Sequence, residues 1–122
     1  MVEREIIDSL KRDLALAESL MIPASEKSLE ELIAVLSDFL PSATNRKLSE
    51  NEADLRLELF IEALADIPAD LIDVARQRCM RNCKFSPSPA EIREQVKPEI
   101  DEREMASSII KALLLKAGIT NL

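Results

Sequence analysis

The chain has 122 residues, of which 47% are hydrophobic and 32% are charged, so it can form one globular domain with a modest core and is not expected to be disordered. It has one glycine and 2% aromatic residues, which disfavours an all-β fold with its many turns and indicates an all-α fold with an aliphatic core. Because the sequence lacks an 18-residue apolar stretch, a signal-peptide pattern and a disulfide framework, we expect a cytoplasmic protein without a membrane span.

The first predicted helix covers residues 2–21. Its apolar residues recur in alternating steps of three and four, which places them on one face of a helix. Pro23 follows and ends the pattern. The residues of this face are Ile7, Leu10, Leu14, Ala17 and Met21.

The second predicted helix begins at Ser28, because Ser28 and Glu31 have the spacing of a capping box. Pro41 ends it at or before residue 40, and residues 41–49 are expected to form a loop. The apolar face of this helix comprises Leu29, Leu32, Ile33, Leu36, Phe39 and Leu40.

The third predicted helix opens with a second capping box, Ser49 and Glu52. A fourth helix is expected over residues 68–82, with Pro68 as its first helical residue. The apolar face of the third helix comprises Ala53, Leu57, Phe60, Leu64 and Ile67. The fourth helix has an apolar seam of Leu71, Ile72, Ala75, Cys79 and Cys83.

A proline-rich turn precedes the next helix. Ser88 is the expected N-cap, Pro89 the first helical residue and Glu91 the partner in a third capping box. Phe85 is expected to anchor this turn in the core. Pro98 is expected to end that helix or to begin the following one.

A final helix is predicted over residues 99–117, with Gly118 as its C-terminal cap. The predicted organisation is therefore a compact bundle of about five helices in residues 1–97, followed by an amphipathic helix in residues 98–122. Because the run 109–115 is apolar over more than one stripe, this helix either packs on the bundle or docks on another chain. The residues concerned are Ile109, Ile110, Leu113 and Leu114.

Several kinds of chemistry are disfavoured. The chain has no histidine, which removes the commonest general base and metal ligand, and its single glycine precludes a glycine-rich phosphate loop. Cys79 and Cys83 share a helix face, but their place on the apolar seam favours buried, unreactive thiols. We therefore expect no enzymatic activity, no catalytic residues, no cofactor and no metal site.

The positive charge is concentrated in one region. Residues 71–98 hold six bases and three acids, whereas residues 1–70 hold seven bases and sixteen acids. This concentration suggests contacts with phosphates or with an acidic protein, although bases also stabilise the C-terminal end of a helix. The candidate binding residues here are Arg76, Arg78, Arg81 and Lys84.

The run Leu64-Ala65-Asp66-Ile67-Pro68, followed by Lys84-Phe85-x-Pro87-Ser88-x-Ala90-Glu91-Ile92, resembles small phage and prophage replication proteins, in particular the phage replicative-helicase loader/inhibitor family. The resemblance covers roughly residues 50–96, and residues 23–26 add a weaker match. It implies a small helical protein that binds a hexameric replicative helicase and helps to deliver it to an origin complex. The shared motif is structural in character and transfers no binding residues. In that family the helicase-contacting part is expected in a flexible C-terminal region, whereas residues 99–117 here are predicted to be an amphipathic helix.

The leading hypothesis is thus a non-enzymatic adaptor of phage-type DNA replication that binds a replicative helicase through protein contacts. One alternative is a DNA-binding regulator that uses the basic cluster and the short helix over residues 88–97. Another alternative is an oligomerisation module that self-associates through the C-terminal helix.

Overall fold

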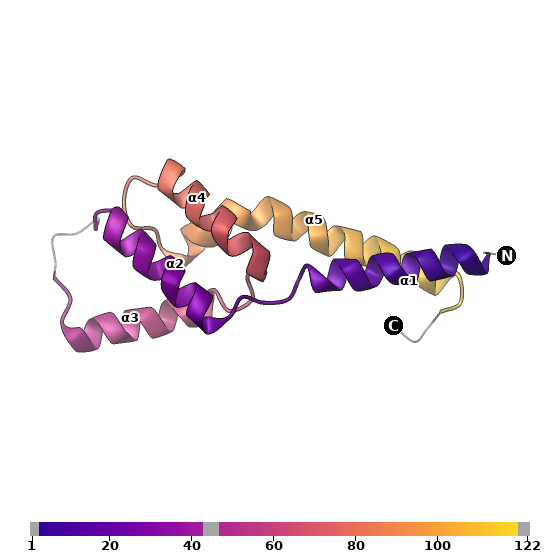
Figure 1. Ribbon diagram of the computed structural model, residues 1–122, viewed down its shortest axis with the longest axis horizontal. Helices are drawn as coiled ribbons and strands as arrows, with labels where there is room; N and C mark the ends of the chain where they lie inside the picture. The colour runs from indigo at the N-terminus through magenta and orange to yellow at the C-terminus, as the bar shows by residue number, and fades with distance from the viewer. Residues whose placement is uncertain (1–2, 43–46, 120–122) are drawn as a thin grey trace. The chain divides into compact units, whose positions relative to one another are not determined.

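The computed structural model describes residues 3–42 and 47–119, which confirm the predicted all-α fold with five helices (Figure 1). In the described ranges the extended pairing is limited to one bridge, between Pro23 and Pro68. Residue 2, predicted to begin the first helix, and residues 43–46 of the predicted loop lie outside these ranges. The helices are α1 (Arg4–Ser19), α2 (Glu26–Phe39), α3 (Glu50–Ala63), α4 (Ile72–Asn82), preceded by the 3-10 helix η1 (Ala69–Leu71), and α5 (Pro89–Lys116).

The chain forms two compact units. The central unit is Ile22–Pro98, and the terminal unit combines Met1–Met21 with Glu99–Leu122. This division differs from the predicted one, because the first helix groups with the C-terminal segment and not with the bundle.

The central unit holds most of the core. Its helix α2 lies against both α3 and α4 (Figure 1). The buried hydrophobic residues of this unit come from every one of its helices, and they are Ala24, Leu29, Leu32, Ile33, Leu36, Phe60, Leu64, Ile67, Leu71, Ala75, Cys79, Ile92 and Val96. Phe39 was predicted to belong to this set, but it is 69% exposed in the last turn of α2.

Two of the three predicted capping boxes are confirmed. The Ser49 hydroxyl accepts from the Glu52 amide at 3.2 Å before α3. At the start of α5, the Glu91 amide donates to the Ser88 hydroxyl and the Ser88 amide donates to the Glu91 carboxylate, each at 3.2 Å. These bonds satisfy amides that a helix N-terminus leaves without partners.

The predicted start of the second helix at Ser28 is wrong. The N-cap is Ser25, whose hydroxyl accepts from the Ser28 amide, and α2 begins at Glu26. Just before it, the Ala24 amide donates to the Ile67 carbonyl at 2.8 Å. The backbone is extended at Ser25, with ψ 156°, and the helix begins directly after it. The N-cap therefore lies three residues before the predicted one.

The same pairing corrects the expected role of Pro68. The Ala69 amide donates to the Ile22 carbonyl at 2.9 Å, and Pro68 itself is extended, with ψ 139°. Pro68 therefore precedes η1 instead of forming the first turn of a helix. It is also fully buried, which fixes the link between α3 and α4.

The expectation that Phe85 anchors the proline-rich turn is also wrong. Phe85 is 43% exposed, whereas Pro87 is fully buried. The Ser86 amide donates to the Pro41 carbonyl at 2.8 Å, which ties the turn to the end of α2. The turn is thus fixed by a backbone bond and a buried proline.

Pro98 does not end or begin a helix, because α5 continues through it. A proline in this position removes the amide that would bond to the carbonyl of Glu94. One residue further on, the Gln95 carbonyl accepts a hydrogen bond from Arg78 Nη1 at 2.7 Å. A side-chain donor therefore reaches the backbone beside the interrupted step, which helps the helix to continue.

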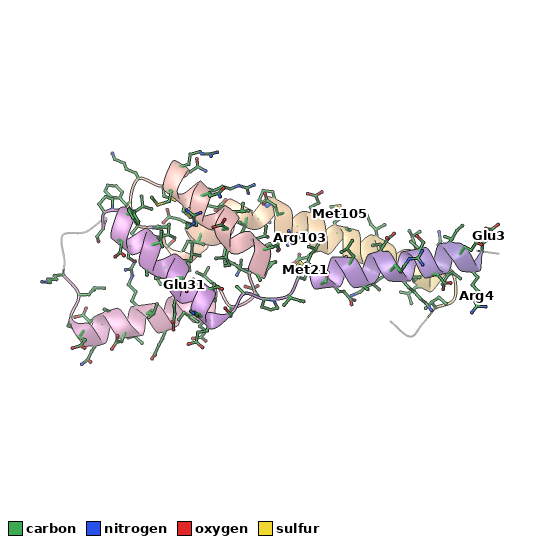
Figure 2. The ribbon with its side chains drawn as sticks, viewed as in Figure 1. Glu3, Arg4, Met21, Glu31, Arg103 and Met105 are labelled. Carbon is green, nitrogen blue, oxygen red and sulfur yellow. The ribbon has the colours of Figure 1, made fainter. Side chains whose placement is uncertain are left out.

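The terminal unit is an antiparallel pair formed by α1 and the second half of α5 (Figure 1). Arg103 lies beside the end of α1, where Met21 is also labelled in Figure 2, and its Nη1 donates to the Leu20 carbonyl at 2.7 Å. This bond places a cation at a helix C-terminus, where it is favourable. The inward residues follow steps of three and four on both helices. They are Ile7, Leu10, Leu14 and Ala17 of α1 and Met21 just after it, as predicted, and Ile100, Arg103, Ser107, Ile110, Leu114 and Ala117 of the other segment.

Gly118 ends α5, as predicted. Its φ is +88°, a left-handed conformation that favours glycine. The Gly118 amide donates to the Leu115 carbonyl and the Ile119 amide to the Leu114 carbonyl, each at 3.0 Å. This pair of bonds is a Schellman motif, which satisfies two of the last carbonyls of the helix.

Candidate partner-binding surfaces

The four predicted basic residues do not form a single patch. Arg78 is partly buried and donates to Gln95, so its guanidinium is engaged in the fold. Arg76 donates from Nε and Nη2 to the Asp73 carboxylate at 3.1 and 2.9 Å. Because consecutive residues of a helix are 100° apart, Arg76 and Arg78 also lie on different sides of α4.

The other two basic residues are exposed, and one of them, Lys84, has acidic neighbours. Arg81 lies in the last turn of α4, where a cation favours the helix terminus. Lys84 follows the helix, with its Nζ 5.7 Å from the centre of the Phe85 ring. Glu91 and Glu94 line the same hollow as Lys84, so the local potential is mixed. This arrangement is less suited to phosphate binding than a one-sided basic stripe would be.

The predicted apolar set on the last helix separates into two faces. Leu114 is fully buried and Ile110 is half-buried, and both face α1. Ile109 and Leu113 are 53% and 46% exposed. The four residues therefore divide between a packing role and a surface role, which helical periodicity alone does not separate.

A hollow with a mainly apolar lining lies beside α3, at residues that were not predicted as a binding site. This α3 groove has a volume of about 410 Å³. Leu55 and Leu59 are more than half exposed, and the neighbouring Phe60 ring is stacked under the Arg56 guanidinium at 4.7 Å. The groove is lined by Leu48, Glu52, Leu55, Arg56, Leu59, Phe60 and Pro89.

The α3 groove has an acidic border. Helix α3 contains five acidic residues and one basic residue. Glu58 and Glu62 lie within one turn of Leu55 and Leu59 on the helix surface, and both are exposed. An apolar floor with an acidic edge suits a partner segment that carries apolar anchors flanked by basic residues.

The signal for this groove was present in the sequence. Leu55 and Leu59 fall outside the predicted inward face of α3, so the helix carries apolar residues on two faces. Helical periodicity assigns one face to the core, and the second face has no partner within the described residues of the central unit. Such a surplus is the mark of a docking surface.

The residues of the proline-containing motif are mainly structural. Arg93 forms a bidentate ion pair with Asp66, with Nη2 at 3.0 Å from Oδ2, and its Nη1 also donates to the Ala63 carbonyl at 3.2 Å. The hydrogen bonds from Arg93 hold the pKa of Asp66 below its ordinary value. Together with the buried Leu64, these contacts join the end of α3 to the start of α5.

The two cysteines differ in burial. Cys79 is fully buried, as predicted, and Cys83 is half-buried; neither forms a disulfide. Burial, followed by the nearby Cys83, raises the pKa of Cys79 to about 12, so its thiol stays protonated at neutral pH. Within residues 3–42 and 47–119, no three acidic or cysteine side chains gather as a metal site would require.

Comparison with known proteins identified no relative: no protein-family description, no curated protein and no solved structure matches this chain. Over the described part of the chain, no helix has the length and apolarity needed to cross a membrane.

Proposed function

We propose that this chain is a non-enzymatic adaptor that binds a protein partner through the α3 groove. The observation that carries the proposal is the apolar surface of Leu55 and Leu59, which the fold leaves exposed beside an acidic border. Burying one such leucine in a partner contributes about 1.5–3 kcal/mol, which is enough to make it a binding anchor. The resemblance over residues 50–96 supports a hexameric replicative helicase as the partner, and hence a role in phage-type DNA replication.

The occupant that fits this groove is an amphipathic helix or an extended segment with basic residues beside its apolar anchors. The acidic border attracts such a segment and repels acidic ones, which contributes selectivity more than affinity. Because Glu58 and Glu62 are exposed, this electrostatic contribution is expected to weaken as salt is raised.

The test uses the purified full chain and the purified hexameric replicative helicase of its host, mixed and followed by sedimentation velocity. Binding by the wild-type chain is expected, and replacing both Leu55 and Leu59 by serine is expected to weaken it by about 100-fold or more, since two apolar anchors are lost. Circular dichroism of each variant checks that its helices are retained.

The matched control is Phe39→Ser. Phe39 is an exposed apolar residue of the central unit that does not line the groove, so this variant is expected to bind like the wild-type chain. If the folded wild-type chain and the folded helicase do not associate, the helicase is not the partner. If both variants bind as tightly as wild type, the groove is not the site.

A further inference from the structure

The terminal unit has very little core of its own. Among its described residues, only Leu14 and Leu114 are buried, and the other inward positions remain half-buried. Two helices in contact along one seam protect few side chains from water, and helical packing usually becomes stable when further helices are added. Apolar side chains on both helices of the terminal unit therefore remain exposed to solvent.

Each helix of this unit carries a second, exposed apolar line. Along α1 and its C-cap the line is made of Ile6, Leu16 and Leu20, with the exposed Asp13 between Ile6 and Leu16. On α5 it is made of Met105, Ile109 and Leu113. At 100° per residue, these lines are rotated by about 100° and about 125° from the inward lines of their own helices.

The two exposed lines lie on the same side of the pair. Both are displaced from the inward line in the same sense about the N-to-C direction of their helix. Because the two helices run antiparallel and face each other, the same sense of rotation brings both lines to one side. The same geometry places charged residues on the opposite side, and these are Arg4, Asp8, Lys11 and Glu18 of α1 and Glu104 and Lys111 of α5.

This apolar side is large enough for a specific interface. The distance from Ile6 to Leu20 along the helix axis is about 21 Å, and two adjacent helices are about 20 Å wide. Two such surfaces in contact bury about 1,000 Å², because side chains protrude beyond the flat area, and this reaches the lower size of biological interfaces.

The charges at the ends of the α5 line match an antiparallel copy of the same line. Met105 and Leu113 each lie four residues from Ile109, and Glu102 and Lys116 each lie seven residues from it. When two copies of α5 cross about Ile109, each Met105 meets a Leu113 and each Glu102 meets a Lys116. A two-fold symmetric interface requires this self-complementarity.

We infer that the chain forms a homodimer in which the apolar sides of two terminal units pack together as a four-helix bundle centred on Ile109. The interface is independent of the α3 groove, which belongs to the central unit. Dimerisation and binding of a partner can therefore fail separately, and different measurements detect each failure.

The first test measures the mass of the full chain by sedimentation equilibrium. The wild-type chain is expected to be a dimer at micromolar concentration. Ile109→Glu brings two carboxylates together at the two-fold axis and is expected to raise the dimer dissociation constant by at least 100-fold. Leu115→Glu is the matched control, because Leu115 is 54% exposed on the charged side of the same helix, and it is expected to remain a dimer.

The second test exchanges exposed charges, which leaves the fold of each chain intact. Glu102→Lys or Lys116→Glu alone creates two like-charge contacts per dimer and is expected to raise the dissociation constant about tenfold. The double exchange restores both pairs and is expected to return it to within about twofold of wild type.

These outcomes decide the inference. The dimer is overturned if the wild-type chain stays monomeric at about 100 μM, well above the micromolar concentration at which dimerisation is expected. Equal dissociation by Ile109→Glu and Leu115→Glu overturns the assignment of the face. A double exchange that is as weak as either single exchange overturns the antiparallel pairing about Ile109.

Discussion

Replacing Arg78 by methionine is expected to destabilise the chain, because the guanidinium of Arg78 bonds to the backbone of α5 next to the step that Pro98 interrupts. Methionine keeps much of the aliphatic stem and removes the charged donor. The bond from Nη1 to the Gln95 carbonyl is 2.7 Å long and partly buried. Hydrogen bonds from charged groups contribute about 1.5–3 kcal/mol, and partial exposure places the expected loss at the lower end, about 1–2 kcal/mol.

Arg78 and Pro98 are also expected to be coupled energetically. Replacing Pro98 by alanine restores an amide to the helix and is expected to stabilise the chain by about 1–3 kcal/mol. The restored amide bonds to the Glu94 carbonyl, one residue before Gln95, so this turn of α5 depends less on the neighbouring bond from Arg78. Arg78→Met is therefore expected to cost about 1 kcal/mol less in the Pro98→Ala background.

The assay is urea unfolding of the four chains of this cycle, followed by helical circular dichroism. Arg81→Met is the control, since Arg81 is exposed in the same helix and is expected to change the free energy of unfolding by less than about 0.5 kcal/mol. An equal cost of Arg78→Met in both backgrounds would separate Arg78 from Pro98. A cost no larger than that of Arg81→Met would show that Arg78 is not structural, and its guanidinium would again be a candidate for binding.

Two further predictions concern local contacts. Because the folded-state pKa of Asp66 is lowered, its ion pair with Arg93 stabilises the fold above the unfolded pKa of about 3.9 and is lost as pH falls through the folded value. Urea unfolding of wild type and Asp66→Asn from pH 7 to pH 2 measures this contribution. The difference in the free energy of unfolding is expected to be below about 1 kcal/mol for this exposed pair and to vanish in acid. A difference that stays constant with pH would contradict the role of the ion pair. Ser88→Ala removes one side of the capping box and is expected to lower the melting temperature by about 3–6 °C. Ser37→Ala, at an exposed position of α2, is expected to have little effect, so equal shifts would exclude the capping role.

The sequence indicated the helices well where the signals were local. The inward line of α1, the caps at Ser49 and Ser88 and the Schellman glycine Gly118 all depend on contacts between residues less than two turns apart. Composition and helical periodicity record such contacts directly, which is why these predictions were confirmed.

The errors arose where distant residues meet. Beside the N-cap Ser25, which replaces the predicted Ser28, Ala24 bonds to Ile67, more than forty positions along the chain. Pro98 stands inside a continuous helix, and the side-chain donor beside the interrupted step comes from Arg78 of another helix. No local pattern contains these partners.

The candidate surfaces show the same division. The sequence determined an all-α chain without histidine, with basic residues concentrated in one region and an excess of apolar residues on the last helix. Only the tertiary structure decided that Arg76 and Arg78 bond within the fold, that Leu55 and Leu59 border a groove, and that Ile109 and Leu113 face away from α1. The physical reason is that a sequence fixes the number of apolar and charged faces of a helix, whereas the packing of helices against one another determines which of those faces remain available to a partner.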